Sequence, residues 1–273
     1  MSDPADVLAD LRAEGDELDA IVSESSEGGE GGEGGEAIWR LATPAPRWSV
    51  AHQIAHLAWT DRAALLAVTD AEGFAAEVEK ALAAPERFVD DGAEEGAALP
   101  PAELLARWRE GRRLLDEALR KVPPGGRFPW YGPPMSATAM ATARLMETWA
   151  HGQDVADALG VVRRPTARLR HVAWIGHRAR DYAYLVRGEQ PPAEPFRVEL
   201  TGPGGESWAY GPEDAAQRVS GDAVEFCLLV TQRVHRDDTG LRAEGADAEH
   251  WLGIAQAFAG PAGPGRGPKG EAS

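Results

Sequence analysis

Three side chains that can bind a metal or move a proton share one stripe of a predicted helix. In the segment A-R-L-M-E-T-W-A-H-G-Q-D-V-A-D-A-L-G, Glu147, His151 and Asp154 are spaced i, i+4 and i+7, so they lie on one helical face. Gly160 follows as the residue expected to end the helix. Burying a carboxylate or an imidazole without a partner costs several kcal/mol, so groups turned toward other helices must be paired or metal-bound. The stripe therefore predicts a site.

A second pair of imidazoles lies on an earlier predicted helix, which begins after Ser49 and ends near residue 69. His52 and His56 are one turn apart on this helix. If the two helices are neighbours in an antiparallel bundle, the imidazoles and Glu147 can converge on one cation. Two neutral imidazoles and one carboxylate suit Zn²⁺, with Fe²⁺, Ni²⁺ and Co²⁺ as alternatives, and three protein ligands leave a coordination position open. The competing interpretation is a buried, hydrogen-bonded polar network without a metal.

The periodicity of apolar residues predicts the helices that must position these groups. Helical spacing is found over 3–22, 49–69, 72–82, 101–121, 136–160 and 167–186. Between these helices, residues 88–99 are predicted to form a charged loop. The Gly/Glu run within 23–37 cannot bury apolar surface and is predicted to be a disordered loop. We expect residues 1–190 to form a helical, metal-binding first domain.

The pattern changes at Pro191, where a second domain is predicted. Alternating apolar residues around a Gly-rich turn indicate a β-hairpin over 191–212. The rest of this domain is predicted to contain helices at 213–218, 221–233 and 246–259 and a short strand at 241–244. Residues 191–260 thus form a small α+β domain, and the Gly- and Pro-rich residues 261–273 form a disordered tail. The predicted fold class is α+β.

Composition limits the partners of the chain. Its 273 residues are 43% hydrophobic, which suffices for a proper core, and its formal net charge is -16. That charge repels phosphate backbones and anionic lipids, so we expect a small-molecule substrate, no nucleic acid and no membrane. The single cysteine, Cys227, lies in an apolar run and is predicted to be a small buried hydrophobe. Without a leader-like or membrane-spanning segment, a cytoplasmic location is expected. The sequence does not specify an oligomeric state.

Two segments carry a resemblance to a known family. W-S-V-A-H-Q-I-A-H-L, followed by R-L-M-E-T-W-A-H-G-Q-D-V-A-D-A-L-G, resembles the DinB-like four-helix bundle of the mycothiol-dependent maleylpyruvate isomerase family over about residues 7–186. The later part is similar to the C-terminal domain of that family. The phrases T-P-A-P, W-Y-G-P-P-M-S, M-E-T-W-A-H-G-Q-D and A-Q-A-F-A-G are most similar to an uncharacterised actinobacterial metal-binding subfamily. Carried over from the family, the metal ligands are His56, Glu147 and His151.

The resemblance implies a metal-dependent transferase or isomerase of the thiol-dependent class. Its substrate would be a small electrophilic metabolite, and mycothiol would be the candidate co-substrate. His52 is our candidate general acid or base, because it lies one turn before His56 and would overlook the metal. Asp154 would either orient His151 or bind the metal itself.

Three further residues are candidates at the site. Arg233 lies where related isomerases present an arginine toward the cleft, so it is a candidate anion clamp; the alternative is a helix C-terminal arginine that favours the helix dipole. Trp130 and Tyr131 would wall a pocket for the substrate or cofactor, or would pack over one end of the bundle.

Two other functions remain open from the sequence. One keeps the metal without the thiol, as a Lewis-acid hydrolase, lyase or cyclase of secondary metabolism. The other is a non-catalytic metal-binding protein, in which His52 or Asp154 would close the open coordination position.

Overall fold

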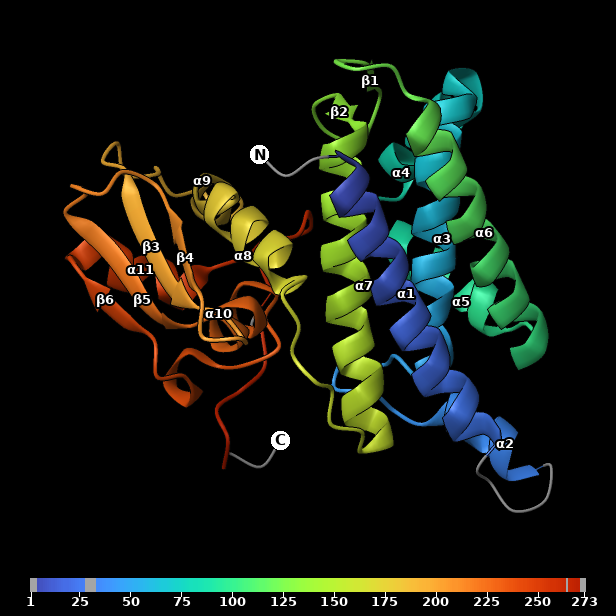
Figure 1. The fold of residues 1–273 in the computed structure, drawn as a ribbon. Helices are drawn as coiled ribbons and strands as arrows, with labels where there is room; N and C mark the ends of the chain where they lie inside the picture. The colour runs from blue at the N-terminus through green and yellow to red at the C-terminus, as the bar shows by residue number, and fades with distance from the viewer. Residues whose placement is uncertain (1–3, 28–32, 264, 271–273) are drawn as a thin grey trace. The chain divides into compact units, whose positions relative to one another are not determined.

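The protein folds into two compact units. The computed structural model describes residues 4–27, 33–263 and 265–270, and the units divide between Val162 and Arg163 (Figure 1). The first unit is helical apart from one short strand pair, and the second combines a four-stranded sheet with helices. The predicted α+β class, with a helical bundle followed by a small α+β region, is confirmed.

Four long helices make up the bundle in the described part of the first unit (Figure 1). They are α1 (Pro4–Glu27), α3 (Val50–Thr69), α6 (Pro101–Lys121) and α7 (Ala137–Leu159). α3 packs along α6, α1 packs along α7, and α3 also contacts α7. Their facing sides bury apolar residues such as Leu18, Ile54, Leu104 and Val155. Burial of this apolar stripe holds the helices together, because isolated helices of this length are marginal in water.

Local sequence signals set the ends of the two helices that carry the predicted site. At the start of α3, Ser49 and His52 form a capping box. α7 begins after Ser136, whose side chain accepts a hydrogen bond of 3.2 Å from the backbone N–H of Ala139. α7 ends at Gly160, which has a φ of 67° in the left-handed region that glycine adopts without strain. Both helices therefore begin and end where the sequence predicts.

The predicted loop over 23–37 is wrong for its described residues. α1 continues to Glu27, and residues 33–37 form α2 (Glu33–Ala37), followed by a 3₁₀ turn, η1 (Ile38–Arg40), that buries Trp39. Ser26 donates to the carbonyl of Val22 at 2.8 Å, so its hydroxyl is bonded within the helix. The Gly-rich residues between these helices, 28–32, lie outside the described residues.

The predicted charged loop over 88–99 is also wrong, because residues 88–97 form α5 (Phe88–Ala97) on the side of α3. Two glycines permit this close packing. A Cβ on Gly96 would come within 2.7 Å of the Cβ of Ala55, and one on Gly92 within 3.0 Å of the Trp59 ring. Glycine here allows close helix contact, which outweighs its low helix propensity.

Two further segments complete the first unit. The short helix predicted over 72–82 is present as α4 (Ala71–Ala83). The Pro- and Gly-rich connection before α7 contains an antiparallel pair, β1 (Arg127–Phe128) and β2 (Met135–Ser136), where no regular structure was expected. Trp130 and Tyr131 lie in the turn between these two short strands.

The second unit is built on a sheet in the order β4-β3-β5-β6. The predicted hairpin is formed by β3 (Phe196–Thr201) and β4 (Ser207–Tyr210), and the predicted strand near 241 by β6 (Arg242–Glu244). The helix predicted over 213–218 is wrong, because its last residues begin β5 (Gln217–Asp222), which pairs in parallel with β3. Val219 lies opposite Val198 in this pairing and both are buried.

Four helices and a 3₁₀ turn complete the described part of the second unit. They are α8 (Leu169–Arg178), α9 (Arg180–Leu185), α10 (Ala223–Val230) and α11 (Ala246–Ile254), with a 3₁₀ turn, η2 (Arg236–Asp238). α8 packs against α10, and the thiol of the fully buried Cys227 lies 3.5 Å from the carbonyl oxygen of Leu169. Burial raises the pKa of this thiol well above its usual value, so it remains protonated.

The observed boundary between the two units, at 162/163, differs from the domain boundary that the sequence predicts at 190/191. Because α8 packs on α10, residues from Arg163 onward belong to the second unit. The described residues of the predicted tail form neither helix nor strand, and the backbone N–H of Lys269 donates to Asp238 at 2.8 Å. Disorder of that tail stays a prediction. Among the described helices, none combines the length and apolar character that a membrane span requires.

Candidate metal centre

His56, Glu147 and His151 converge between α3 and α7. One ligand atom from each lies within 4.8 Å of the others, and this is the one group of its kind among the residues that the structure describes. The Glu147 Oε2 atom is 3.1 Å from His151 Nε2 and 3.5 Å from His56 Nε2, so one carboxylate oxygen faces both imidazoles. The two imidazole ring centroids are 4.5 Å apart. The predicted convergence of two helices on one point is therefore present.

The carboxylate at the centre of this group is held ionised. Burial acts to raise the pKa of Glu147, but hydrogen bonds from His151 and His56 and their charges outweigh it, and the pKa lies well below its usual value. The Glu147 side chain is 21% exposed, so it is reachable from solvent. A negative charge thus sits between two nitrogen donors.

This donor set fits a divalent metal. Two imidazole nitrogens and one carboxylate oxygen are the ligands that Zn²⁺ and neighbouring transition metals accept, and three protein ligands leave a position open. The Nδ1 atom of His56 is buried and has no hydrogen-bond partner among the described residues. That leaves His56 bound to the group only through Nε2, the nitrogen that faces Glu147.

Two tryptophans that the sequence did not single out flank the imidazoles. The Trp48 ring lies 5.2 Å from the His56 ring and stacks on His151 at 5.8 Å, with 23° between the planes. The Trp59 ring lies 6.0 Å from His56. Both indoles are half-buried. The position of Trp59, three residues after His56 on one helix, is the signal in the sequence that would have found it.

The other three candidate residues, His52, Asp154 and Arg233, are not part of the three-residue group. His52 is part of the N-terminal cap of α3, where its Nδ1 is 2.8 Å from Ser49 Oγ and 3.3 Å from the Ser49 backbone nitrogen. Asp154 is buried on α7. Arg233 belongs to the second unit, just beyond α10, and donates to the carbonyl of Thr231 at 2.5 Å. The roles of all three residues stay predictions.

Trp130 and Tyr131 join an aromatic cluster that includes residues of α4 and α5. Trp130 stacks on Phe74 with ring centroids 5.6 Å apart, and Tyr131 contacts both Phe74 and Phe88. Burial raises the pKa of Tyr131 to about 12, so its phenol stays protonated at neutral pH. These contacts are those expected from aromatic packing, and the predicted role in binding substrate or cofactor stays a prediction.

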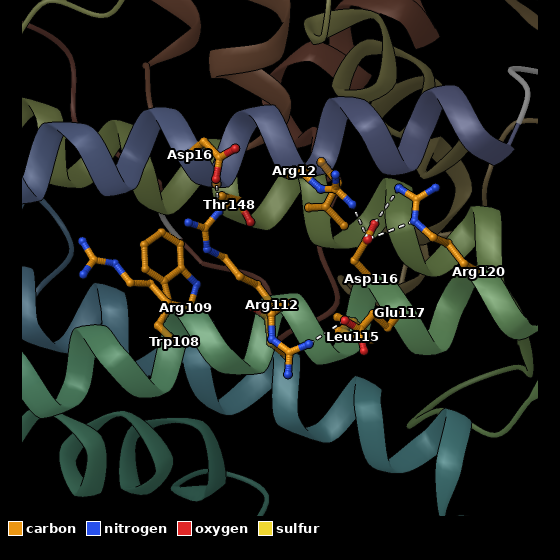
Figure 2. Close-up of a pocket in the computed structure, with 14 residues that line it drawn as sticks. Arg12, Asp16, Trp108, Arg109, Arg112, Leu115, Asp116, Glu117, Arg120 and Thr148 are labelled. Atoms are coloured by element: carbon orange, nitrogen blue, oxygen red, sulfur yellow. Dashed lines mark hydrogen bonds and ion pairs between the residues drawn. The ribbon is translucent and has the colours of Figure 1, made fainter.

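A cavity of about 520 Å³ lies between the helices of the bundle and does not include the three candidate ligands. Figure 2 shows Arg12 and Arg120 both pointing toward Asp116, and the structure pairs Arg112 with Asp16 at 2.7 Å. Each arginine that lines the cavity has a carboxylate partner; these arginines are Arg12, Arg109, Arg112, Arg113 and Arg120. Because these guanidinium groups are already paired with carboxylates, the cavity is a weaker candidate for a binding site than the histidine–glutamate group.

Comparisons with known proteins add the following similarities. A family model described as mycothiol maleylpyruvate isomerase N-terminal domain matches residues 11–156, and one described as wyosine base formation matches residues 192–243. Two Mycobacterium tuberculosis proteins, the uncharacterized proteins Rv0036c and MT0041, are each 57% identical over 266 residues, which is 97% of this chain and 100% of theirs.

Solved structures give a similarity of fold. Two crystal structures of mycothiol-dependent maleylpyruvate isomerase, one of them of a mutant, are 17% identical to this chain, with TM-scores of 0.56 and 0.55. Each match covers 89% of this chain and 93% of the other. At this level of identity the match shows a shared fold.

Proposed function

Because the chain belongs to the family of the mycothiol maleylpyruvate isomerase N-terminal domain, we propose that it is a metal-dependent transferase or isomerase of the thiol-dependent class. Its substrate is a small electrophilic metabolite, and mycothiol is the candidate thiol. The observation that carries this proposal is the convergence of His56, Glu147 and His151, with ligand atoms within 4.8 Å of one another. The name of the structural relatives supports the choice of thiol.

The three converging residues would hold the metal, with Zn²⁺ as the first candidate. When bound there, a divalent metal supplies a Lewis-acid position that lowers the pKa of a thiol or polarises a carbonyl. Glu147 contributes the one negative charge of the donor set, and the imidazoles contribute neutral nitrogens. The ring of Trp48 packs beside both imidazoles and the ring of Trp59 beside His56, which would place apolar surface next to the metal.

His52 is our candidate acid or base beside this centre. Its Nδ1 accepts the backbone N–H of Ser49 within the helix cap, so in the neutral ring the proton is on Nε2. Nε2 is then the nitrogen that can exchange a proton with a substrate. Asp154, which lies on α7 with Glu147 and His151, is a candidate outer partner of the centre, and Arg233 is the candidate anion clamp.

Turnover measured with and without the thiol tests this proposal. Purified full-length protein is loaded with Zn²⁺ and assayed with maleylpyruvate and related small electrophiles, with mycothiol present or absent. We expect turnover only when mycothiol is present, and none from Glu147→Ala under either condition.

Two outcomes would contradict the thiol-dependent proposal. Equal turnover with and without mycothiol would favour the thiol-independent Lewis-acid enzyme. A full equivalent of bound zinc without turnover of any electrophile would favour the non-catalytic metal-binding protein.

A further inference from the structure

Gln53 contacts the candidate metal centre on the side of the His151 ring that faces away from Glu147. It lies on α3 one turn before His56, and its side chain is completely buried. Its Oε1 atom is 2.5 Å from Nδ1 of His151, the ring nitrogen on the side away from Glu147. A fully buried amide at this distance from a candidate ligand is a direct contact with the ring that would bind the metal.

The orientation of the Gln53 amide follows from a chain of hydrogen bonds that ends at a backbone carbonyl. The carbonyl oxygen of Trp48 can only accept, and Thr43 Oγ1 lies 2.8 Å from it, so the hydroxyl donates there. The hydroxyl must then accept from the amide NH₂ of Gln53, at 2.8 Å. The amide oxygen therefore faces His151, whose Nδ1 must carry the proton.

This direction decides which nitrogen of His151 is available to a metal. Left to itself, a neutral imidazole 3.1 Å from the Glu147 carboxylate would place its proton on Nε2 and donate it to that carboxylate. The acceptor at Gln53 instead fixes a proton on Nδ1, so that Nε2 is the nitrogen whose lone pair can bind a metal. Outer partners of this kind orient metal-binding histidines and increase metal affinity.

The loop that orients Gln53, residues 42–49, is hydrogen-bonded to α5. Its ends are joined by a β-bridge between Ala42 and Ser49, and Arg47 has a φ of 69°, which is unusual for a residue with a side chain. Asp90 on α5 accepts from the Trp48 indole at 3.1 Å and from Arg47 at 2.6 Å. Contacts from outside the loop thus hold its conformation.

We propose that Gln53 is a positioning residue of the metal centre: aligned by Thr43 and the Trp48 carbonyl, it holds His151 in the tautomer that presents Nε2 to a metal. The proposal rests on the proposed function, which supplies the metal. His56 provides the contrast, because its Nδ1 has no partner in the described part of the chain. The substitution of Gln53 should therefore act through His151 alone.

The test measures the tautomer and the zinc affinity separately. In the metal-free full-length chain, ¹⁵N NMR shifts report which nitrogen of His151 is protonated, and the loss of signals in His151→Ala assigns them. We expect Nδ1 of His151 to carry a proton in the wild type and to lose it in Gln53→Leu, in which the proton is on Nε2 alone. Chelator competition should show zinc binding about 10- to 100-fold weaker in Gln53→Leu. Gln53→Glu keeps an acceptor and should stay within a few fold of the wild type.

Two further variants keep the test decisive if Gln53→Leu fails to fold. Thr43→Val leaves Gln53 in place but removes the group that directs its amide, so we expect a smaller shift toward the Nε2–H form and a smaller loss of affinity. Thr142→Val is the matched control: it removes another buried hydroxyl, bonded to the carbonyl of Thr138 at 2.9 Å, and should change neither reading.

The possible failures can be told apart. If folded Gln53→Leu or Thr43→Val keeps both the Nδ1–H form and wild-type zinc affinity, the positioning role is wrong and the metal centre stands. A wild-type chain that binds no zinc contradicts the proposed function, and the nitrogen shifts still decide for or against the tautomer.

Discussion

Helices α3 and α7 carry two groups of charged or titratable side chains, which differ in how the carboxylate is neutralised. Toward one end, Asp61 on α3 and Arg144 on α7 form an ion pair of 2.8 Å in which both side chains are almost inaccessible. Nearby, His56 on α3 faces Glu147 and His151 on α7. The first group contains its own permanent cation. The second contains a carboxylate and two imidazoles, and so lacks one.

The Asp61–Arg144 pair already contains both charges, whereas the group of His56, Glu147 and His151 can accept a cation. A buried carboxylate must be neutralised or paired, and a guanidinium does this for Asp61. Even so, burial raises the pKa of Asp61 despite the opposing charge and hydrogen bond of Arg144. Glu147 has only titratable partners, which a metal can replace as the source of positive charge. The comparison predicts that the two groups respond differently to the same kinds of substitution.

The largest expected effect is loss of the metal. We expect His56→Ala and Glu147→Ala each to reduce metal from one equivalent per chain to none, because two remaining protein ligands hold a divalent ion poorly. Elemental analysis of the purified protein measures this. Asp157→Ala, which removes an exposed carboxylate from the same helix, should keep the full equivalent. A full equivalent in either ligand variant would show that the assigned ligand set is wrong.

The next effect is on stability, and it tests the closed pair. Asp61→Ala leaves the Arg144 guanidinium buried without its partner, so we expect the free energy of unfolding to fall by about 3–5 kcal/mol. Urea unfolding measures it, and metal content should not change. In the double variant Asp61→Leu with Arg144→Met, stability should return toward the wild-type value, since neither charge remains.

The outcome that would break the comparison is loss of metal from folded Asp61→Ala. Asp61 and His56 are five residues apart on α3, and the charge of His56 acts on the pKa of Asp61. If the pair were part of the metal centre, its removal would reduce metal content while leaving the chain folded. Retained metal with reduced stability would establish that the two groups are separate.

Sequence patterns predicted those features that depend on neighbours along the chain. The apolar stripe of residues 101–121 and the caps at Ser49 and Ser136 gave helices with the observed ends. One-turn spacing, together with the family resemblance, selected the three residues that the structure brings together. These signals operate within one helix, so a single sequence contains them.

Features that depend on contacts between distant segments were missed. α5 forms because its glycines allow close packing on α3, and β5 forms because Val219 pairs beside β3. Likewise, Gln53 contacts Thr43 in the loop before α3 and His151 on α7. The residues next to Gln53 in the sequence do not indicate either contact. Tertiary contacts override local propensity at such positions. Asp61 and Arg144 belong to the same class, because their burial is visible only in the folded bundle.

The smallest expected effect extends the comparison to ion pairs near the surface. Asp19 on α1 accepts from Arg109 and Arg112 on α6, and the Arg109 side chain is 48% exposed. Partial burial acts to raise the pKa of Asp19, but the hydrogen bond and charge of Arg109 and the charge of Arg112 outweigh it and lower the pKa below its ordinary value of 3.8. A lowered pKa in the folded state means that the ionised carboxylate stabilises the fold.

The pH dependence of Asp19→Asn measures this contribution. Above about pH 4 the wild type should be more stable than the variant by about 1 kcal/mol or less, because exposed ion pairs contribute little. As the pH falls below 3.8, the unfolded carboxylate is protonated first, and the difference should vanish once the pH passes the lower folded-state pKa. Urea midpoints between pH 7 and pH 2.5 test it. A difference that stays constant over this range would mean that Asp19 acts by packing. Its charge would then not stabilise the fold, unlike the charges of the two groups between α3 and α7.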